Sequence, residues 1–238
     1  MTPNALNQSQ EGEFDRLVPS SATPRIYLQP IAAPSILGLF GFAAATFMVA
    51  AWYAHWYGGP DTGVMLFPFA AMLGGVAQFL AGMWAFKARD GLATAVHSTW
   101  GSFWIAFGIL NLLVLSGKIA QPGILSPELG YWFIVIAAIT WMCSLAAFAE
   151  NFGMVAVLLA LSIGSTIEAI ARLVGSDGLQ VAAGYCFIIS AILAWYTASA
   201  MMFEEAFGHP ILGSFKTKRM RQERIIPGIG EPGVIRGQ

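Results

Sequence analysis

Charged side chains are scarce in this sequence. Asp, Glu, Lys and Arg make up 11% of its 238 residues, whereas hydrophobic residues make up 57%. An ordinary soluble domain carries about 25% charged residues. So few charges could not cover the surface of a soluble domain of this size, and the composition therefore favours a protein of the lipid bilayer. The formal net charge of −1 provides no field that would attract a nucleic acid, so we expect no such partner.

Cysteine and the motifs of catalysis are equally scarce. The two cysteines, Cys143 and Cys186, lie in apolar runs and give neither a disulfide framework nor the spacing of metal ligands. The sequence contains no Gly-x-Ser-x-Gly, no phosphate-binding loop and no His-Glu-x-x-His. We therefore expect no catalytic residues, no metal and no cofactor, which is not the pattern of an enzyme.

Long runs without charge take the place of these motifs. Six such runs have the roughly 20 apolar residues that a helix needs to cross the hydrocarbon core. They predict an all-α membrane protein with six transmembrane helices, in residues 35–57, 62–86, 93–116, 131–149, 152–174 and 179–204. A β-barrel is disfavoured because its strands are half as long and alternate apolar with polar residues.

The basic residues predict the orientation of these helices. With an even number of spans both termini share one side, and that side holds ten of the twelve Lys and Arg residues. Positive residues remain cytoplasmic, so we expect both termini in the cytoplasm. Trp52, Tyr53, Trp56 and Tyr57 would form an aromatic belt at the outer interface.

The expected domain organisation follows from this topology. A polar cytoplasmic tail (1–34) precedes the six-helix transmembrane domain (35–208), and a basic, flexible cytoplasmic tail (209–238) follows it. The chain would be an integral protein of the plasma membrane or of a bacterial inner membrane. The basic cluster in the last tail is either a solvated topology anchor or a contact for anionic lipid headgroups.

Two charged residues lie inside the predicted fifth helix. Glu168 and Arg172 are four residues apart and so share one helix face. They form either a structural ion pair or a functional proton or charge relay, because an unpaired charge at membrane depth is costly. A neighbouring Arg172 would favour the anionic form of Glu168, and it could instead attract a carboxylate substrate.

Three uncharged or weakly basic groups raise the same choice between packing and function. Gln78 is in the middle of the second helix, where its amide either holds helices together or lines a pathway. Ser102 either lines the pathway or bonds to a carbonyl of its own helix. His97, near the start of the third helix, is interpreted as an interfacial histidine rather than as a proton shuttle, because no partner is evident.

Four segments together resemble the acetate uptake transporter family, the YaaH-type succinate–acetate/proton symporters. They are Leu37–Phe42 (Leu-Gly-Leu-Phe-Gly-Phe), Gly74–Gly82 (Gly-Gly-Val-Ala-Gln-Phe-Leu-Ala-Gly), Gly101–Trp104 (Gly-Ser-Phe-Trp) and Glu205–Gly208 (Glu-Ala-Phe-Gly). Their order and spacing match the family over about residues 33–210.

The resemblance implies a transporter or channel for acetate and similar small carboxylates such as succinate, coupled to protons. It also implies a homohexamer with one pathway in each protomer. The family's narrow hydrophobic constriction would be formed here by Phe42, Trp100 and a residue of helix 5, Ile163 or alternatively Leu161. Gln78 and Ser102 would offer hydrogen bonds along this path.

Several positions depart from the family pattern. The opening Asn-Pro-Ala-Pro is Ala33-Pro34-Ser35-Ile36, the glutamate that ends helix 2 is Ala85, and the tyrosine of the constriction is Trp100. Trp100 is bulkier than tyrosine and lacks its hydroxyl. The alternative function is therefore a membrane scaffold or accessory subunit that keeps the fold without transporting.

Overall fold

The six predicted spans are present in the structure, a computed structural model that describes residues 31–59 and 61–213. All regular elements in these ranges are helical, so the prediction of an all-α membrane protein with six spans is confirmed. The spans are α2 (Pro34–Tyr53), the composite α3–η1–α4 (Thr62–Ala88), α5 (Gly91–Leu115), α6 (Pro127–Ala147), α7 (Phe152–Val174) and α8 (Asp177–Phe207). Most of the two predicted tails, residues 1–30 and 214–238, lies outside the described residues.

The second span is not a uniform α-helix. It begins as α3 (Thr62–Phe69), widens into the π-helix η1 (Ala70–Ala77) and continues as α4 (Gln78–Ala88). Pro68 lies inside α3, just before the π segment. Proline has no N–H to donate to the preceding turn, and a π segment is one way in which a helix absorbs such an interruption. The prediction of one regular helix over 62–86 missed this change.

Local polar residues set where three of the spans begin. The side chains of Asp90, Asn151 and Ser176 accept hydrogen bonds from backbone N–H groups in the first turns of α5, α7 and α8. Such caps satisfy N–H groups that have no partner within the helix. The short connections before these helices allow α4–α5, α6–α7 and α7–α8 to pack as antiparallel neighbours.

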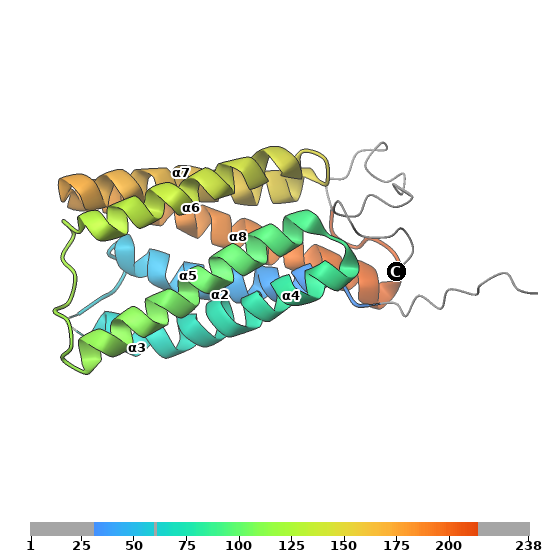
Figure 1. Cartoon of the computed structure of the whole chain (residues 1–238). Helices are drawn as coiled ribbons and strands as arrows, with labels where there is room; N and C mark the ends of the chain where they lie inside the picture. The colour runs from blue at the N-terminus through green and yellow to red at the C-terminus, as the bar shows by residue number, and fades with distance from the viewer. Residues whose placement is uncertain (1–30, 60, 214–238) are drawn as a thin grey trace, which may run out of the picture. The chain divides into compact units, whose positions relative to one another are not determined.

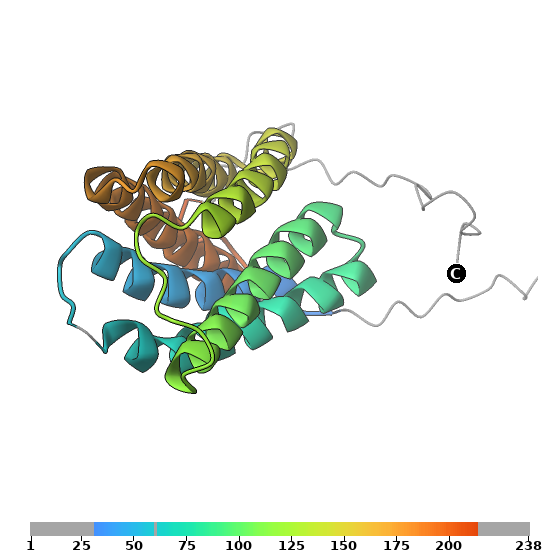
Figure 2. The same cartoon turned by 60° about the vertical axis from the view of Figure 1, so that its left-hand side comes forward.

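The helices form a bundle whose order in space differs from that in the chain. α6 packs on α7, α7 on α8 and α8 on α2, while α2 also packs on the composite span and that span on α5 (Figure 1). α5 and α6 are joined by the loop between Leu115 and Pro127 but make few contacts (Figure 2). The bundle is therefore loosest between α5 and α6.

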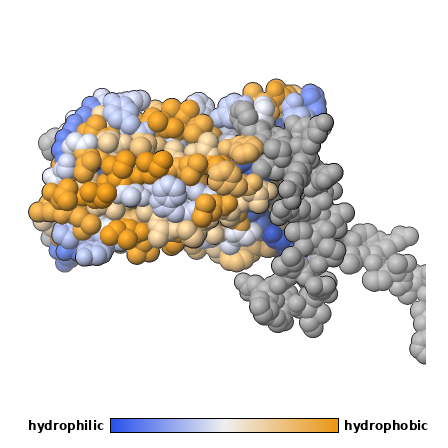
Figure 3. All heavy atoms as spheres, turned by 90° about the horizontal axis from the view of Figure 1, so that it is seen from above, coloured by the Kyte–Doolittle hydropathy of each residue, from blue (hydrophilic) through white to orange (hydrophobic). Residues whose placement is uncertain are grey.

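The outer surface is largely apolar, as a lipid-facing surface must be. Hydrophobic side chains follow the lengths of the helices, and the most hydrophilic atoms lie toward the two ends of the bundle (Figure 3). Exposed large residues such as Phe86, Met65, Met142 and Trp195 are more than half accessible. This distribution agrees with an integral membrane protein.

Small residues let α4 and α5 approach closely within one protomer. A Cβ on Gly101 of α5 would lie 2.7 Å from the backbone nitrogen of Phe79, and one on Gly82 of α4 would overlap Ser98. Gly74, Gly75, Gly82 and Gly101 are all buried inside the protomer.

We expect Gly101→Ala to destabilise the fold relative to Gly91→Ala by about 1–3 kcal/mol, the usual cost of overpacking a core. Both sites are in α5, but nothing lies within 4 Å of a Cβ on Gly91. Alanine gains more helix propensity at Gly101, inside α5, than at Gly91, its first residue, so the difference is a lower limit for the cost of the overlap with the Phe79 backbone. Unfolding in mixed micelles, followed by circular dichroism, gives both values. Equal stabilities would show that α4 and α5 separate at little cost.

Candidate functional site: an aromatic constriction below a charged vestibule

Two aromatic side chains meet in the core between α2 and α5. Phe42 and Trp100 are 2% and 3% exposed, and their rings are edge to face with centroids 6.0 Å apart. The Trp100 indole N–H donates to the Thr140 hydroxyl on α6 over 3.1 Å. Because Trp100 is held by a hydrogen bond as well as by packing, its ring has a fixed position in this layer.

The helix 5 residue of the constriction was left open between two positions. Leu161 is 1% exposed and belongs to the same buried cluster as Phe42 and Trp100, whereas Ile163 is 43% exposed on the outer surface of α7. The structure therefore brings Leu161, and not Ile163, to the aromatic pair. Ile163 lies where a side chain meets lipid or another subunit.

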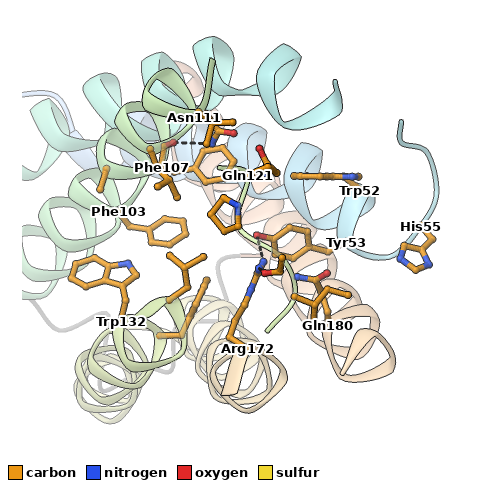
Figure 4. Close-up of a pocket in the computed structure, with 18 residues that line it drawn as sticks. Trp52, Tyr53, His55, Phe103, Phe107, Asn111, Gln121, Trp132, Arg172 and Gln180 are labelled. Carbon is orange, nitrogen blue, oxygen red and sulfur yellow. Dashed lines mark hydrogen bonds between the residues drawn. The ribbon is translucent and has the colours of Figure 1, made fainter. Parts of the chain in front are cut away.

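A vestibule of about 530 Å³ opens toward the end of the bundle where α2 ends (Figure 4). It lies in the loose region between α5 and α6 and reaches α7 and α8. Most of its wall is aromatic or aliphatic, and its polar groups are few. Its lining includes Trp52, Tyr53, Phe103, Phe107, Asn111, Trp132, Phe133, Arg172 and Gln180.

One wall of this vestibule holds a charged cluster around Arg172. Its Nε donates to Glu168 Oε1 over 2.7 Å. Its two terminal nitrogens donate to the Gly123 carbonyl and the Tyr53 hydroxyl, each over 3.1 Å (Figure 4). Gln180 of α8 donates to the same carboxylate oxygen over 3.1 Å. Arg172 thus links α7, α2 and the α5–α6 loop at one point.

The two members of this cluster face different surroundings. Glu168 is completely buried, and its Oε2 has no hydrogen-bond partner among the described residues. Arg172 borders the vestibule, and its three hydrogen bonds to Glu168, Gly123 and Tyr53 use three of the five N–H donors of the guanidinium. The ion pair predicted from the four-residue spacing is present, and only its arginine lines the vestibule.

A much smaller cavity, about 20 Å³, lies between the vestibule and the aromatic pair. It shares Tyr53, Phe103 and Phe133 with the vestibule and is also lined by Trp100. Thr46 and Trp104 line it too, and the Thr46 hydroxyl and the Trp104 indole N–H have no partner among the described residues. This volume suffices for about one water molecule.

Two further buried polar side chains lie near the aromatic pair. Gln78 is 0% exposed beside Gly41, and neither atom of its amide has a partner among the described residues. His97 is 1% exposed and its ring lies against Gly38. The interpretation of His97 as an interfacial histidine was therefore wrong, because α2 covers it.

Ser102 is placed away from this set. It is exposed, and its hydroxyl donates to the Ser98 carbonyl one turn earlier in α5 over 2.8 Å. The structure thus favours the local bond over a position inside the protomer. Tyr53, assigned to an aromatic belt from the sequence, is instead half-buried and bonded to Arg172.

Sequence reasoning missed Tyr53, Gln180, Thr46 and Trp104 as parts of this arrangement. Gln180 carried a usable signal, because an amide within an apolar run must find a partner. Tyr53, Thr46 and Trp104 carried no such signal, because tyrosine, threonine and tryptophan are common throughout membrane helices.

Comparison with known proteins gives consistent matches. The model of a family described as GPR1/FUN34/yaaH matches residues 16–212. "Acetate transporter protein patA" of Aspergillus clavatus is 29% identical over 203 residues, which are 80% of this chain and 81% of that protein. "Ammonia transport outward protein 2" of Saccharomyces cerevisiae is 27% identical over 172 residues, 71% of this chain, and the match spans only 61% of that protein's length.

A solved structure shares the fold. The chain superposes on the structure titled "Structure of the bacterial acetate channel SatP" with a TM-score of 0.71 and 22% identity. The match covers 77% of this chain and 99% of that one. The six-helix arrangement is therefore a known one.

Proposed function

Because the chain belongs to the GPR1/FUN34/yaaH family, we propose that it carries acetate and similar small carboxylates across the membrane, together with protons. The observation that carries this proposal is the layered arrangement inside one protomer. A vestibule bordered by Arg172 leads through a small, mostly apolar cavity to the layer of Phe42, Trp100 and Leu161.

The groups along this path match a small carboxylate better than a cation. Arg172 offers a guanidinium, and the Trp104 indole can only donate a hydrogen bond. A carboxylate accepts such bonds, whereas ammonium has only donors. The aromatic layer beyond is apolar, and there an acid or a paired anion and proton passes at lower cost than a bare carboxylate.

The charged cluster has a role at the vestibule in this proposal. Arg172 attracts the incoming carboxylate, and Glu168 holds the guanidinium in place from its buried side. Of the alternatives that the sequence left open for Glu168 and Arg172, this proposal takes the functional one, a vestibule charge with Arg172 in contact with the substrate. Gln78 supplies hydrogen bonds near the aromatic pair, while Ser102 and Ile163 remain outside the path.

The assembly and orientation complete the proposal. We propose a homohexamer with cytoplasmic termini, in which protomers pack through apolar grooves such as that lined by Phe40, Ala44, Phe47 and Trp195. This groove lies on the outside of α2 and α8, where small residues would admit a neighbouring helix. A particle mass in detergent below that of six chains would contradict this part of the proposal.

The decisive experiment compares labelled acetate uptake by liposomes with and without the purified protein. We expect faster initial uptake with the protein, stimulated by an inward proton gradient and inhibited by unlabelled succinate but not by ammonium. Protein-free vesicles are the essential control, because acetic acid itself permeates bilayers. Equal rates with and without the protein, for every one- to four-carbon acid and pH tested, would favour the scaffold alternative.

A further inference from the structure

His97 is a titratable group directly beside the aromatic constriction. It precedes Trp100 by three residues on α5, and its ring lies against Gly38, which precedes Phe42 by four residues on α2. Residues three and four apart share one helix face. α2 and α5 both run toward the vestibule, so His97 lies about one helical turn beyond the aromatic pair on the side away from the vestibule (Figure 1).

The close approach at Gly38 makes room for this imidazole. A Cβ at position 38 would overlap the ring of His97. Any residue larger than glycine would therefore push the imidazole out of its site. α2 is built so that a histidine can be enclosed at this level of the bundle.

The imidazole has no visible structural task. Neither Nδ1 nor Nε2 has a hydrogen-bond partner among the described residues. Leaving a buried polar group unbonded costs about 1–3 kcal/mol in proteins. If this position served packing alone, an apolar side chain would therefore stabilise the fold better than histidine. Gln78, whose amide is also buried and unbonded, has its Cβ beside Gly41, which lies between Gly38 and Phe42 in α2.

The surrounding helices provide no counter-charge to His97. Within its bounds α2 has one titratable side chain, Tyr53, which lies at its vestibule end, and α4 has one, the exposed Lys87, which lies over the Trp84 ring. α5 has no other titratable residue, and α6, which also packs on α5, has Glu128 and Tyr131 at its vestibule end and the thiol Cys143 further along. At the α4–α5 turn, Asp90 caps α5 beside Arg89, about two turns or roughly 10 Å along the helix from His97.

We propose that His97 is the proton-binding residue of the pathway. A lone imidazolium would be costly at this depth, and so would a lone carboxylate. Together they form a neutral ion pair. One proton binds a nitrogen of the imidazole when one carboxylate arrives beside the aromatic pair. The proton and the carboxylate then leave on the same side of the membrane. No covalent bond of the substrate is broken.

This arrangement links the two ligands thermodynamically. If a bound carboxylate strengthens proton binding to His97, then a bound proton strengthens carboxylate binding by the same factor. The coupling between proton binding and carboxylate binding therefore needs no large conformational change. The inference rests on the proposed carboxylate transport and names the group that would carry its proton.

The test measures protons taken up when acetate binds to the purified protein in weakly buffered detergent solution. A pH indicator should report about one proton for each acetate bound by the wild type. His97→Gln should still bind acetate but take up none. His209→Gln is the matched control, because His209 is exposed beyond the end of α8 and does not line the vestibule, and it should behave as the wild type.

A second measurement covers the case in which His97→Gln does not fold. His55, His97 and His209 are the three histidines of the chain, so a variant lacking His55 and His209 keeps one imidazole. Acetate should shift its labelled-histidine NMR signal to that of imidazolium. Proton uptake by His97→Gln equal to the wild type, or an unshifted signal with acetate bound, would overturn the proposal. Absence of acetate binding by the wild type would instead count against carboxylate transport itself.

Discussion

Arg172→Met should destabilise the folded protein by about 3–5 kcal/mol, the cost of breaking a buried ion pair from one side. Glu168 is completely buried and would keep only the bond from Gln180. The substitution would also release Gly123 and the Tyr53 hydroxyl from the same guanidinium. Unfolding in mixed micelles measures the loss, with exposed Lys118→Met as the control for removing one positive charge.

The double variant Glu168→Gln, Arg172→Met separates charge from packing. If the loss arises from an uncompensated carboxylate, neutralising Glu168 should recover most of it, because replacing a whole buried ion pair is often close to neutral. A double variant as unstable as Arg172→Met would show that the bonds to Gly123 and Tyr53 carry the stability instead.

Trp100→Ala should widen the constriction and relax its selectivity by size. We expect the ratio of succinate to acetate uptake to rise on the order of tenfold, since a tight apolar pocket discriminates substrates by about 10–200-fold for each methylene. The ring removed is 3% exposed and packs against Phe42 and Phe103. Initial uptake rates of the two acids in liposomes provide the ratio.

Thr140→Val is the matched control for this variant. It removes the hydroxyl that accepts the Trp100 N–H bond but leaves the indole ring in the constriction. It should cost about 1–3 kcal/mol of stability, because a buried donor is left without a partner. Its succinate-to-acetate ratio should stay near that of the wild type. If Trp100→Ala leaves the ratio of succinate to acetate uptake unchanged, the constriction that limits substrate size lies elsewhere.

The span count was predictable because the bilayer imposes it. A charge inside the hydrocarbon is so costly that Asp, Glu, Lys and Arg mark the ends of helices, as Asp90 does at the start of α5. The π segment was not predictable in the same way. Its signal, Pro68, changes hydrogen bonding within the helix and leaves the hydropathy of the span unaltered.

The faces of the helices were harder to predict than their ends. Ile163 and Leu161 are two residues apart, about 200° around the helix, so one is on the surface when the other is buried. In soluble proteins the polar face reveals the orientation, but a lipid-facing surface is as apolar as the core. Sequence alone therefore could not show which of these two residues is buried, nor that Ser102 faces outward.

His97 shows a second limit of the sequence. Its burial depends on Gly38, in another helix and far away along the chain. Nothing in the residues next to His97 indicates that α2 comes so close. By contrast, the Glu168–Arg172 pair depends on spacing within one helix, and there the sequence predicted the contact correctly.

The π-helix between Pro68 and Gln78 makes the second span tolerant of a one-residue change in length. A π turn holds more residues than an α turn, so a helix can take up one extra residue there while the segments on either side keep nearly the same faces toward their neighbours. Deleting one residue would restore regular α winding, and Gly63 would stay close to Asn111 and Trp52 at the vestibule. We therefore expect lineages of this protein to differ by one residue in this stretch more readily than in the other spans.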